Sequence, residues 1–309
     1  MYMRKTKNLK KIKKIKGGRT LKKKNCSPYG EDNKINNKSC LNKDIILKLK
    51  KSYNNNNKEN KIKSRSLRKI WESLKERKPN CQDELCWLND IDNKRTKETI
   101  KKLLYAPDQP DEWKKNPDEW LSNYDILDVL EQYEYKYKNF KFIGPTPINF
   151  NSPDIEDKKT CVWNELCKFN LKYYIKNKIN KIGVIFNLAK QGDAGTHWVS
   201  LFIDIKNKFI LYFDSNGEAC PPEIYSLIMN VEKQGKKEGI QFKIVYNTYE
   251  HQKTNTECGM YSLYFIITIL TEEINGKKVL ITEKLINHFT KQRIPDNLVF
   301  NRRKIYYNE

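Results

Sequence analysis

The stretch CGMYSLYFIITIL, residues 258–270, is apolar nearly all round and follows directly on the polar residue Glu257. A helix without a polar face is buried on every side. We therefore predict a helix that begins at Cys258 and lies at the centre of a domain. The run is well short of the ~20 residues that a helix needs to span a bilayer, so no transmembrane helix is expected.

The sequence around this run predicts a mixture of strands and helices. A helix follows Pro221-Pro222 and runs to about residue 237, a last helix spans about 282–292, and residues 67–135 are largely helical. The fold class is therefore α+β, with a mixed central sheet. Four segments read as strands: 182–188, 198–205, 208–213 and 241–246.

The net charge of +22 is concentrated at one end of the 309-residue chain. Residues 1–80 hold 27 Lys and Arg against 6 Asp and Glu, whereas residues 81–309 hold 33 against 32. We expect residues 1–66 to form a basic, disordered arm, because Lys, Asn and Ser dominate it. A helical extension (67–114) and a folded domain (115–309) follow. The arm suits nucleic-acid phosphates, anionic membranes or an import receptor, and a solvated tail fits its composition equally well.

The spacing of the cysteines and histidines along the sequence does not indicate a metal site or a disulfide scaffold. The eight cysteines contain no Cys-x-x-Cys pair, and the three histidines are not grouped with them. The lysine-rich start has no apolar core of a secretory signal. We therefore expect a protein that is not secreted and stays in a reducing compartment, with no metal and no other cofactor.

Four polar residues stand at the ends of the predicted elements. His197 precedes one strand, Asp214 follows the next, and Gln252 and Cys258 stand in the loop that enters the buried helix. A cysteine protease needs a thiolate, an imidazole that exchanges the proton, a group that orients the imidazole, and donors for the oxyanion. Cys258, His197, Asp214 and Gln252 with the Cys258 backbone N–H can fill these roles in that order. A helix N-terminus also favours the thiolate.

Each residue also has an ordinary structural interpretation. Cys258 alone reads as a buried, inert cysteine, Asp214 as a turn or cap residue, and Gln252 as a loop residue. Among the histidines, His197 is preferred as the base because a glycine-containing loop precedes it and Trp198 can cover its ring. The other two histidines, His251 and His288, are expected on the surface.

These motifs resemble a known family. His197-Trp198, Phe213-Asp214-Ser215, Gln252 and Glu257-Cys258-Gly259 resemble the His-Trp, Asp-Ser and Gln-x5-Cys-Gly pattern of the Ulp1-like cysteine proteases, which include SUMO proteases and are related to adenain. The chain order of the four residues is also that of the family, over roughly residues 115–300. The resemblance implies a papain-like, Ulp1-like fold whose buried helix carries the nucleophile. It also implies substrate contacts from Trp198 and Gly259.

A narrower likeness concerns three further segments. Residues 120–126, 142–150 and 161–167 are similar to segments of the polyprotein-processing proteases of large cytoplasmic DNA viruses, the asfarvirus-type branch. This implies an endopeptidase that cuts structural polyproteins after Gly-Gly during virion maturation, in the host cytoplasm and the virion. The cellular branch would instead remove SUMO or a related modifier, as a deSUMOylating or deubiquitinating isopeptidase in the nucleus or cytoplasm.

Other classes remain open from the sequence. One is acyl transfer to other acceptors, and another is a nucleic-acid-binding structural protein with an inert thiol. The expected partners are a Gly-Gly-containing polyprotein and nucleic acid held by the arm. Gly17-Gly18 in the arm is itself a Gly-Gly pair, for which a chance flexible dipeptide is a better interpretation than a self-cleavage site.

Overall fold

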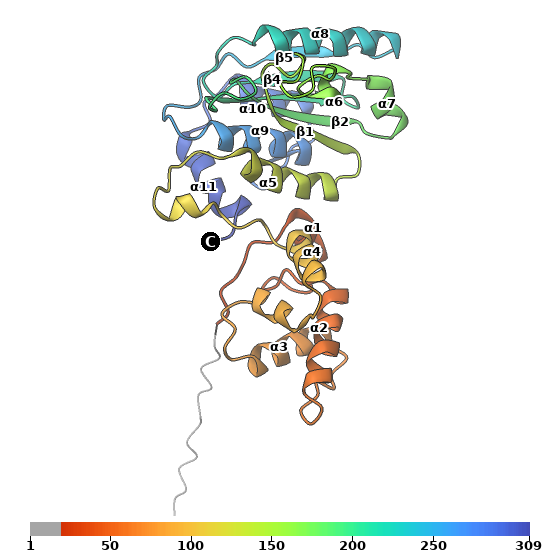
Figure 1. Cartoon of the computed structure of the whole chain (residues 1–309), viewed down its shortest axis with the longest axis vertical. Coiled ribbons are helices and arrows are strands. Elements are labelled where there is room, and N and C mark those ends of the chain that lie inside the picture. Colours follow the sequence, from red (N-terminus) through yellow and green to blue (C-terminus); the bar gives the residue numbers. More distant parts are fainter. Residues whose placement is uncertain (1–19) are drawn as a thin grey trace, which may run out of the picture.

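A five-stranded mixed sheet forms the centre of the larger part of the molecule in the computed structural model, which describes residues 20–309 (Figure 1). The first and last pairs of neighbouring strands are parallel and the two inner pairs are antiparallel. The predicted α+β class with a mixed sheet is confirmed. In spatial order the strands are β1 (Phe140–Pro147), β2 (Lys181–Asn187), β3 (Trp198–Asp204), β4 (Phe209–Phe213) and β5 (Lys243–Tyr246).

Helices cover both faces of this sheet because its strands are buried on both sides. One face packs against α9 (Cys258–Thr271), whose residues from Cys258 to Leu270 are all buried, as predicted. The same face carries α5 (Asn123–Lys136), α10 (Thr282–Thr290) and α11 (Asp296–Tyr306). The opposite face carries α6 (Asn164–Cys167), α7 (Leu171–Lys176) and α8 (Pro222–Lys237), and a short hairpin, β6 (Glu273–Ile274) and β7 (Lys277–Lys278), follows α9.

A second, smaller unit is made of helices and lies below the sheet in Figure 1. Its core combines apolar residues from before and after residue 66, among them Ile46, Leu49, Trp71 and Trp87. Its elements are α1 (Pro28–Asn33), α2 (Lys43–Asn56), α3 (Leu67–Arg77), the 3-10 turn η1 (Leu85–Asp90) and α4 (Lys94–Leu104); a further 3-10 turn, η2 (Asp111–Lys114), leads to the sheet-containing body.

The expectation of a disordered arm over residues 1–66 is therefore wrong for residues 20–66. The scattered apolar residues of this segment, such as Ile46, Leu49 and Tyr53, lie on one face of α2 and are buried against later helices. The buried carboxylate of Glu84 also holds this segment against the later helices, since it accepts hydrogen bonds from Ser39 Oγ (2.7 Å) and from Trp71 Nε1 (3.0 Å). The rest of that prediction, with Gly17-Gly18, lies outside the described residues.

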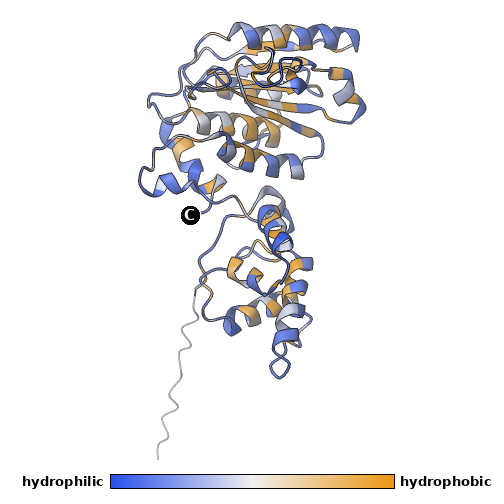
Figure 2. Ribbon diagram, in the orientation of Figure 1, coloured by the Kyte–Doolittle hydropathy of each residue, from blue (hydrophilic) through white to orange (hydrophobic). Residues whose placement is uncertain are grey.

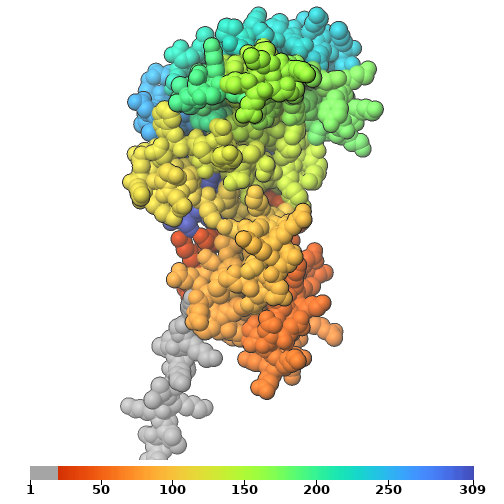
Figure 3. Space-filling model, viewed as in Figure 1, coloured from red at the N-terminus to blue at the C-terminus, as the bar shows by residue number. Residues whose placement is uncertain are grey.

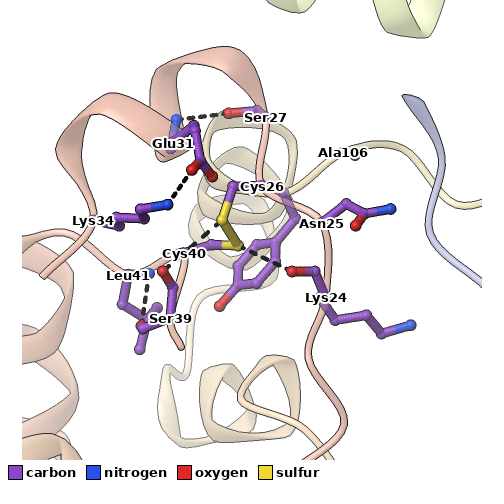
Figure 4. The surroundings of a disulfide bond; sticks show 12 residues. Lys24, Asn25, Cys26, Ser27, Glu31, Lys34, Ser39, Cys40, Leu41 and Ala106 are labelled. Carbon is purple, nitrogen blue, oxygen red and sulfur yellow. Dashed lines mark hydrogen bonds and ion pairs between the residues drawn. A yellow bond between two sulfur atoms is a disulfide. The ribbon is translucent and has the colours of Figure 1, made fainter. Parts of the chain in front are cut away.

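The prediction that the chain has no disulfide scaffold is also wrong. Six of the eight cysteines form disulfides between residues only 5 to 14 positions apart: Cys26–Cys40, Cys81–Cys86 and Cys161–Cys167. The search for Cys-x-x-Cys pairs misses such spacings. Figure 4 shows the first disulfide, which joins the segment before α1 to the segment before α2. Two of the three disulfides thus lie in the helical unit.

The helical unit and the body meet along a continuous contact, visible in the space-filling view of Figure 3. Tyr29 of α1 packs edge-on against Tyr135 of α5, with ring centroids 5.4 Å apart. Asn308, just after α11, bridges the two parts: its Oδ1 accepts from the Asn25 backbone N–H (2.6 Å) and its Nδ2 donates to Ala106 O (2.8 Å). No helix within residues 20–309 is long and apolar enough to cross a bilayer.

Candidate active site

Cys258 is the first residue of α9 and is buried at the edge of the central core. Its position follows from the sequence, because the apolar run begins at this residue and the preceding loop is polar. The backbone N–H groups of a first helical turn have no partner within the helix, so they and the macrodipole favour a negative charge here. Among residues 20–309, only this cysteine and Cys220 are free.

The pairing of β3 with β4 brings His197 and Asp214 together. The two strands are antiparallel with Ser200 opposite Phe213, so the residue before β3 and the residue after β4 lie at the same edge. His197 Nε2 lies 2.7 Å from Asp214 Oδ1, and the Asp214 side chain is almost fully buried. The backbone N–H of Asn216 donates to the same oxygen (2.8 Å), which fixes the carboxylate.

The imidazole of His197 lies between this carboxylate and the thiol of Cys258. Burial alone would lower the pKa of His197, because it disfavours the charged ring. The hydrogen bonds with Asp214 and Cys258 and the charges of these two groups outweigh that effect and raise the pKa of His197 to about 9. The ring is therefore held as an imidazolium at neutral pH, in contact with both partners.

Gln252 lies next to the same strand end, held through its side chain. Its Oε1 accepts from Ser215 Oγ (2.9 Å) and its Nε2 donates to Thr254 O (2.6 Å). The backbone N–H of Gln252 also donates to Ser215 O (2.9 Å). The amide is thus anchored to the residue that follows Asp214, on the loop that leads to Cys258.

A cavity of about 360 Å³ lies beside His197, between residues 120–124 and residues 195–198. Trp198 is nearly buried in its wall and donates through Nε1 to Leu121 O (3.2 Å). Gly259 packs closely against two of these residues: an added Cβ would lie 3.1 Å from Leu121 Cβ and 3.3 Å from Trp198 Cδ1. A side chain at position 259 would therefore crowd Leu121 and Trp198, two residues that line the cavity.

Residues 176–298 match the Ulp1 protease family, C-terminal catalytic domain. This segment contains His197, Asp214, Gln252 and Cys258 in the order described above. The segment that carries these four residues is therefore similar to the catalytic domain of Ulp1 cysteine proteases.

Two viral proteases are similar to this chain in sequence. A putative thiol protease of Acanthamoeba polyphaga mimivirus is 38% identical over 156 residues, which are 50% of this chain and 49% of the relative. A SUMO-1 cysteine protease of African swine fever virus is 27% identical over 154 residues, 47% of this chain and 56% of that protein. This chain thus spans about half the length of the curated relatives that it matches.

A crystal structure of an African swine fever virus protease shares the fold, with a TM-score of 0.60 and 21% sequence identity. The superposition covers 93% of this chain and 97% of that chain. A coverage this high takes in the helical unit as well as the sheet. The likeness in fold therefore extends over both parts of the chain.

The other two histidines of the matched segment are buried, which contradicts the prediction of surface positions. His251 Nε2 lies 2.9 Å from Phe289 O, and its Nδ1 accepts from the Ile294 backbone N–H (3.0 Å). His288 contacts Tyr264 OH through Nε2 (2.9 Å). Burial lowers the pKa of His251; the hydrogen bond with Phe289 O opposes this effect and the Arg293 charge adds to it. Burial lowers the pKa of His288 to about 4. Both therefore act as neutral packing residues.

Two residues of the site escaped the sequence reasoning. Trp120 is 43% exposed and lines the same cavity as Trp198, so it offers an aromatic face to a bound peptide. Its signal in the sequence is the Trp120-Leu121-Ser122-Asn123 segment, which resembles viral proteases but does not by itself indicate a contact with substrate. Arg303 of α11 is the other, and no motif marks it.

Arg303 holds Glu257, the residue before Cys258. Its Nη2 and Nε donate to the two carboxylate oxygens of Glu257 (2.8 and 3.3 Å), and both side chains are buried. Its Nη1 donates to Pro117 O (3.1 Å) and Glu119 O (3.0 Å), at the start of the cavity wall. One guanidinium thus joins the entry of α9 to the segment that carries Trp120. Within residues 20–309 no group of three or more His, Cys, Asp or Glu residues could hold a metal ion.

Proposed function

We propose that this protein is a cysteine endopeptidase that cleaves after Gly-Gly and processes viral structural polyproteins during virion maturation, in the host cytoplasm and the virion. The main support is the contact of His197 with both Asp214 and Cys258 at the N-terminus of α9. The two matched relatives come from large DNA viruses, which supports a viral substrate.

In the proposed mechanism the Cys258 thiolate attacks the carbonyl carbon of the P1 glycine. The oxyanion is stabilised by the Cys258 backbone N–H and by the Gln252 amide, which Ser215 and Thr254 orient. The imidazolium of His197 gives its proton to the leaving amine, and a thioester remains. Water then attacks the thioester while His197 removes its proton, and the acid product leaves the regenerated thiolate. Asp214 keeps the ring oriented throughout.

The proposed selectivity for Gly-Gly rests on the close packing of Gly259 against Leu121 and Trp198. The Gly259 contacts show that little space separates the nucleophile's helix from Leu121 and Trp198. A substrate side chain larger than hydrogen would meet these walls, whereas an extended glycine pair would not. Trp198 and Trp120 would lie on the two sides of the bound dipeptide.

The substrate class is tested by offering the protein three targets in parallel: a Gly-Gly-x polyprotein segment, the same segment with alanine at P1, and a SUMO-type precursor. We expect cleavage of the first and at least a tenfold slower reaction of the second, since added side-chain bulk costs about 1–3 kcal/mol in a tight pocket. Preferential cleavage of the modifier would favour the isopeptidase function instead. No cleavage of any target would favour an inert thiol.

The pH dependence of cleavage reports on His197. Because the pKa of this ring is raised to about 9, the imidazolium that protonates the leaving group is present at neutral pH and lost above about pH 9. We expect kcat/KM to fall as the pH rises through that value. Asp214→Asn removes the charge that raises the pKa, so its alkaline limb moves to lower pH. Asp193→Asn, an exposed neighbour, serves as control, and an unmoved limb in Asp214→Asn would contradict the assignment.

A further inference from the structure

The basic character of the chain belongs in large part to a folded unit. Residues 20–105 hold 23 Lys and Arg against 11 Asp and Glu, whereas residues 106–309 hold 28 against 27. These cations are therefore carried on helices and loops with defined positions, and not only on residues 1–19. A charged surface with fixed geometry can match the spacing of charges on a partner, which a flexible tail cannot do.

One concentration of this charge is the segment that joins α2 to α3. Lys61, Lys63 and Arg65 are exposed, while Ile62 between the first two is buried and Ser64 is half-buried. Side chains that alternate in this way stand on one side of an extended chain, about 6.6 Å apart at every second residue. That rise is comparable to the distance between successive phosphates along a nucleic acid strand. We call Lys61, Lys63 and Arg65 the basic ridge.

Specific contacts hold the backbone of the basic ridge. The Ile62 backbone N–H donates to Asn54 Oδ1 (2.7 Å), and Asn54 Nδ2 donates back to Ile62 O (3.2 Å). Lys50 Nζ donates to Ser64 O (2.8 Å). Asn54 and Lys50 belong to α2, so contacts with this helix hold the backbone of the basic ridge in place. The three cations are thus pre-organised at a low cost in entropy on binding.

The cations of the basic ridge have no acidic partners in the described part of the chain. None of the three forms an ion pair, and the exposed Lys69 on the first turn of α3 forms none either. Glu59 is the single acidic residue between positions 45 and 71. The ridge lies at the end of the helical unit that points away from the sheet, where the ribbon is strongly hydrophilic (Figure 2). Its positive field is therefore uncompensated and open to solvent.

Nucleic acid fits this surface better than an anionic membrane does. Peripheral membrane anchors combine cations with exposed aromatic or large apolar side chains. Within residues 20–105, Leu47 is the one large hydrophobic residue that is exposed, and both tryptophans of the unit are buried. Asn55, Asn56 and Asn60, which are exposed next to the ridge, are instead suited to hydrogen bonds with phosphate and sugar oxygens.

We propose that the basic ridge, with Lys69 and the neighbouring asparagines, binds the phosphate backbone of nucleic acid without sequence selectivity. This site lies on the helical unit, apart from Cys258 and its cavity, so bound nucleic acid leaves the candidate active site open. The binding does not depend on the peptidase activity.

The proposal is tested with the full chain and a fluorescein-labelled single-stranded DNA of about 20 nucleotides, whose binding is followed by anisotropy over a series of salt concentrations. The test variant carries Lys61→Gln, Lys63→Gln and Arg65→Gln. The matched control carries Lys233→Gln, Lys236→Gln and Lys237→Gln, three exposed cations of α8. Both variants have the same net charge and both keep residues 1–19. Thermal unfolding of each variant verifies that the fold is retained.

We expect the ridge variant to bind at least about tenfold more weakly at 0.1 M salt, and the slope of log K against log salt to fall by about 2, because three phosphate contacts are lost. The α8 control should retain both values to within about twofold. Equal losses in both variants would overturn the proposal, since charge alone would then explain them. Unchanged binding in the ridge variant would also overturn it, as would a wild-type protein that binds anionic vesicles but no DNA.

Discussion

Replacement of Cys258 by serine is expected to lower the rate of Gly-Gly cleavage at least about a thousandfold. The hydroxyl of serine is far less acidic than a thiol, so serine is a much weaker nucleophile at this position. The fold should be retained, because the two side chains differ in one atom at a position that is the first of its helix. Rates of peptide cleavage by the purified wild type and variant provide the measurement.

Cys220→Ser is the matched control for this prediction, since it removes the other free thiol. Burial raises the pKa of Cys220 to about 12, so this thiol stays protonated at neutral pH and is a poor nucleophile. We expect wild-type rates from this variant to within about twofold. Comparable cleavage by wild type and Cys258→Ser, or a loss of activity in Cys220→Ser alone, would show that the nucleophile is assigned to the wrong residue.

Replacement of Arg303 by methionine is expected to lower the free energy of unfolding by about 3–5 kcal/mol, the usual result when one partner of a buried ion pair is removed. The Glu257 carboxylate, which the guanidinium contacts twice, would remain buried without a counter-charge. The Pro117 and Glu119 carbonyls would lose a donor as well. Because Glu257 immediately precedes Cys258, we also expect slower cleavage by the variant protein that remains folded.

Denaturant unfolding at neutral pH measures this effect, and two further variants make it specific. Lys304→Met changes the next, exposed residue of the same helix and should alter stability by no more than about 0.5 kcal/mol. Glu257→Gln combined with Arg303→Met removes both charges and should recover part of the loss. If Arg303→Met were as stable as Lys304→Met, the buried pair would have no role in holding the site.

Local sequence patterns suffice to predict those helices and strands whose apolar residues form a clear pattern. The helix at Cys258 and all four predicted strands lie within two residues of their expected positions. The helix and three of these strands have apolar residues that are buried all round or on both sides, which makes their patterns clear. The strand Phe140–Pro147 was not predicted, since Lys141, Gly144 and Pro145 break the apolar pattern of a strand that pairs only with β2. The helix Asp296–Tyr306 was missed because its buried positions include Arg303, a residue type that a hydrophobic pattern scores as solvent-exposed.

The candidate site was predictable to the extent that it consists of loop residues at strand and helix ends. His197 and Asp214 meet because β3 and β4, which are consecutive in sequence, pair as a hairpin. The burial of His251 and His288 could not be inferred, because each depends on a partner about 24 to 43 residues away in sequence. The same is true of residues 20–66, whose core is completed by residues beyond position 66.

The disulfides determine which cysteines a thiol reagent can label in a preparation of this protein. Three of them occupy six of the eight cysteines, and the high pKa of Cys220 makes its thiol unreactive at neutral pH. A small alkylating reagent applied to the oxidised protein therefore has one favoured target, Cys258. The stoichiometry of labelling then equals the fraction of competent molecules, so turnover can be expressed per active site without engineering away any other cysteine.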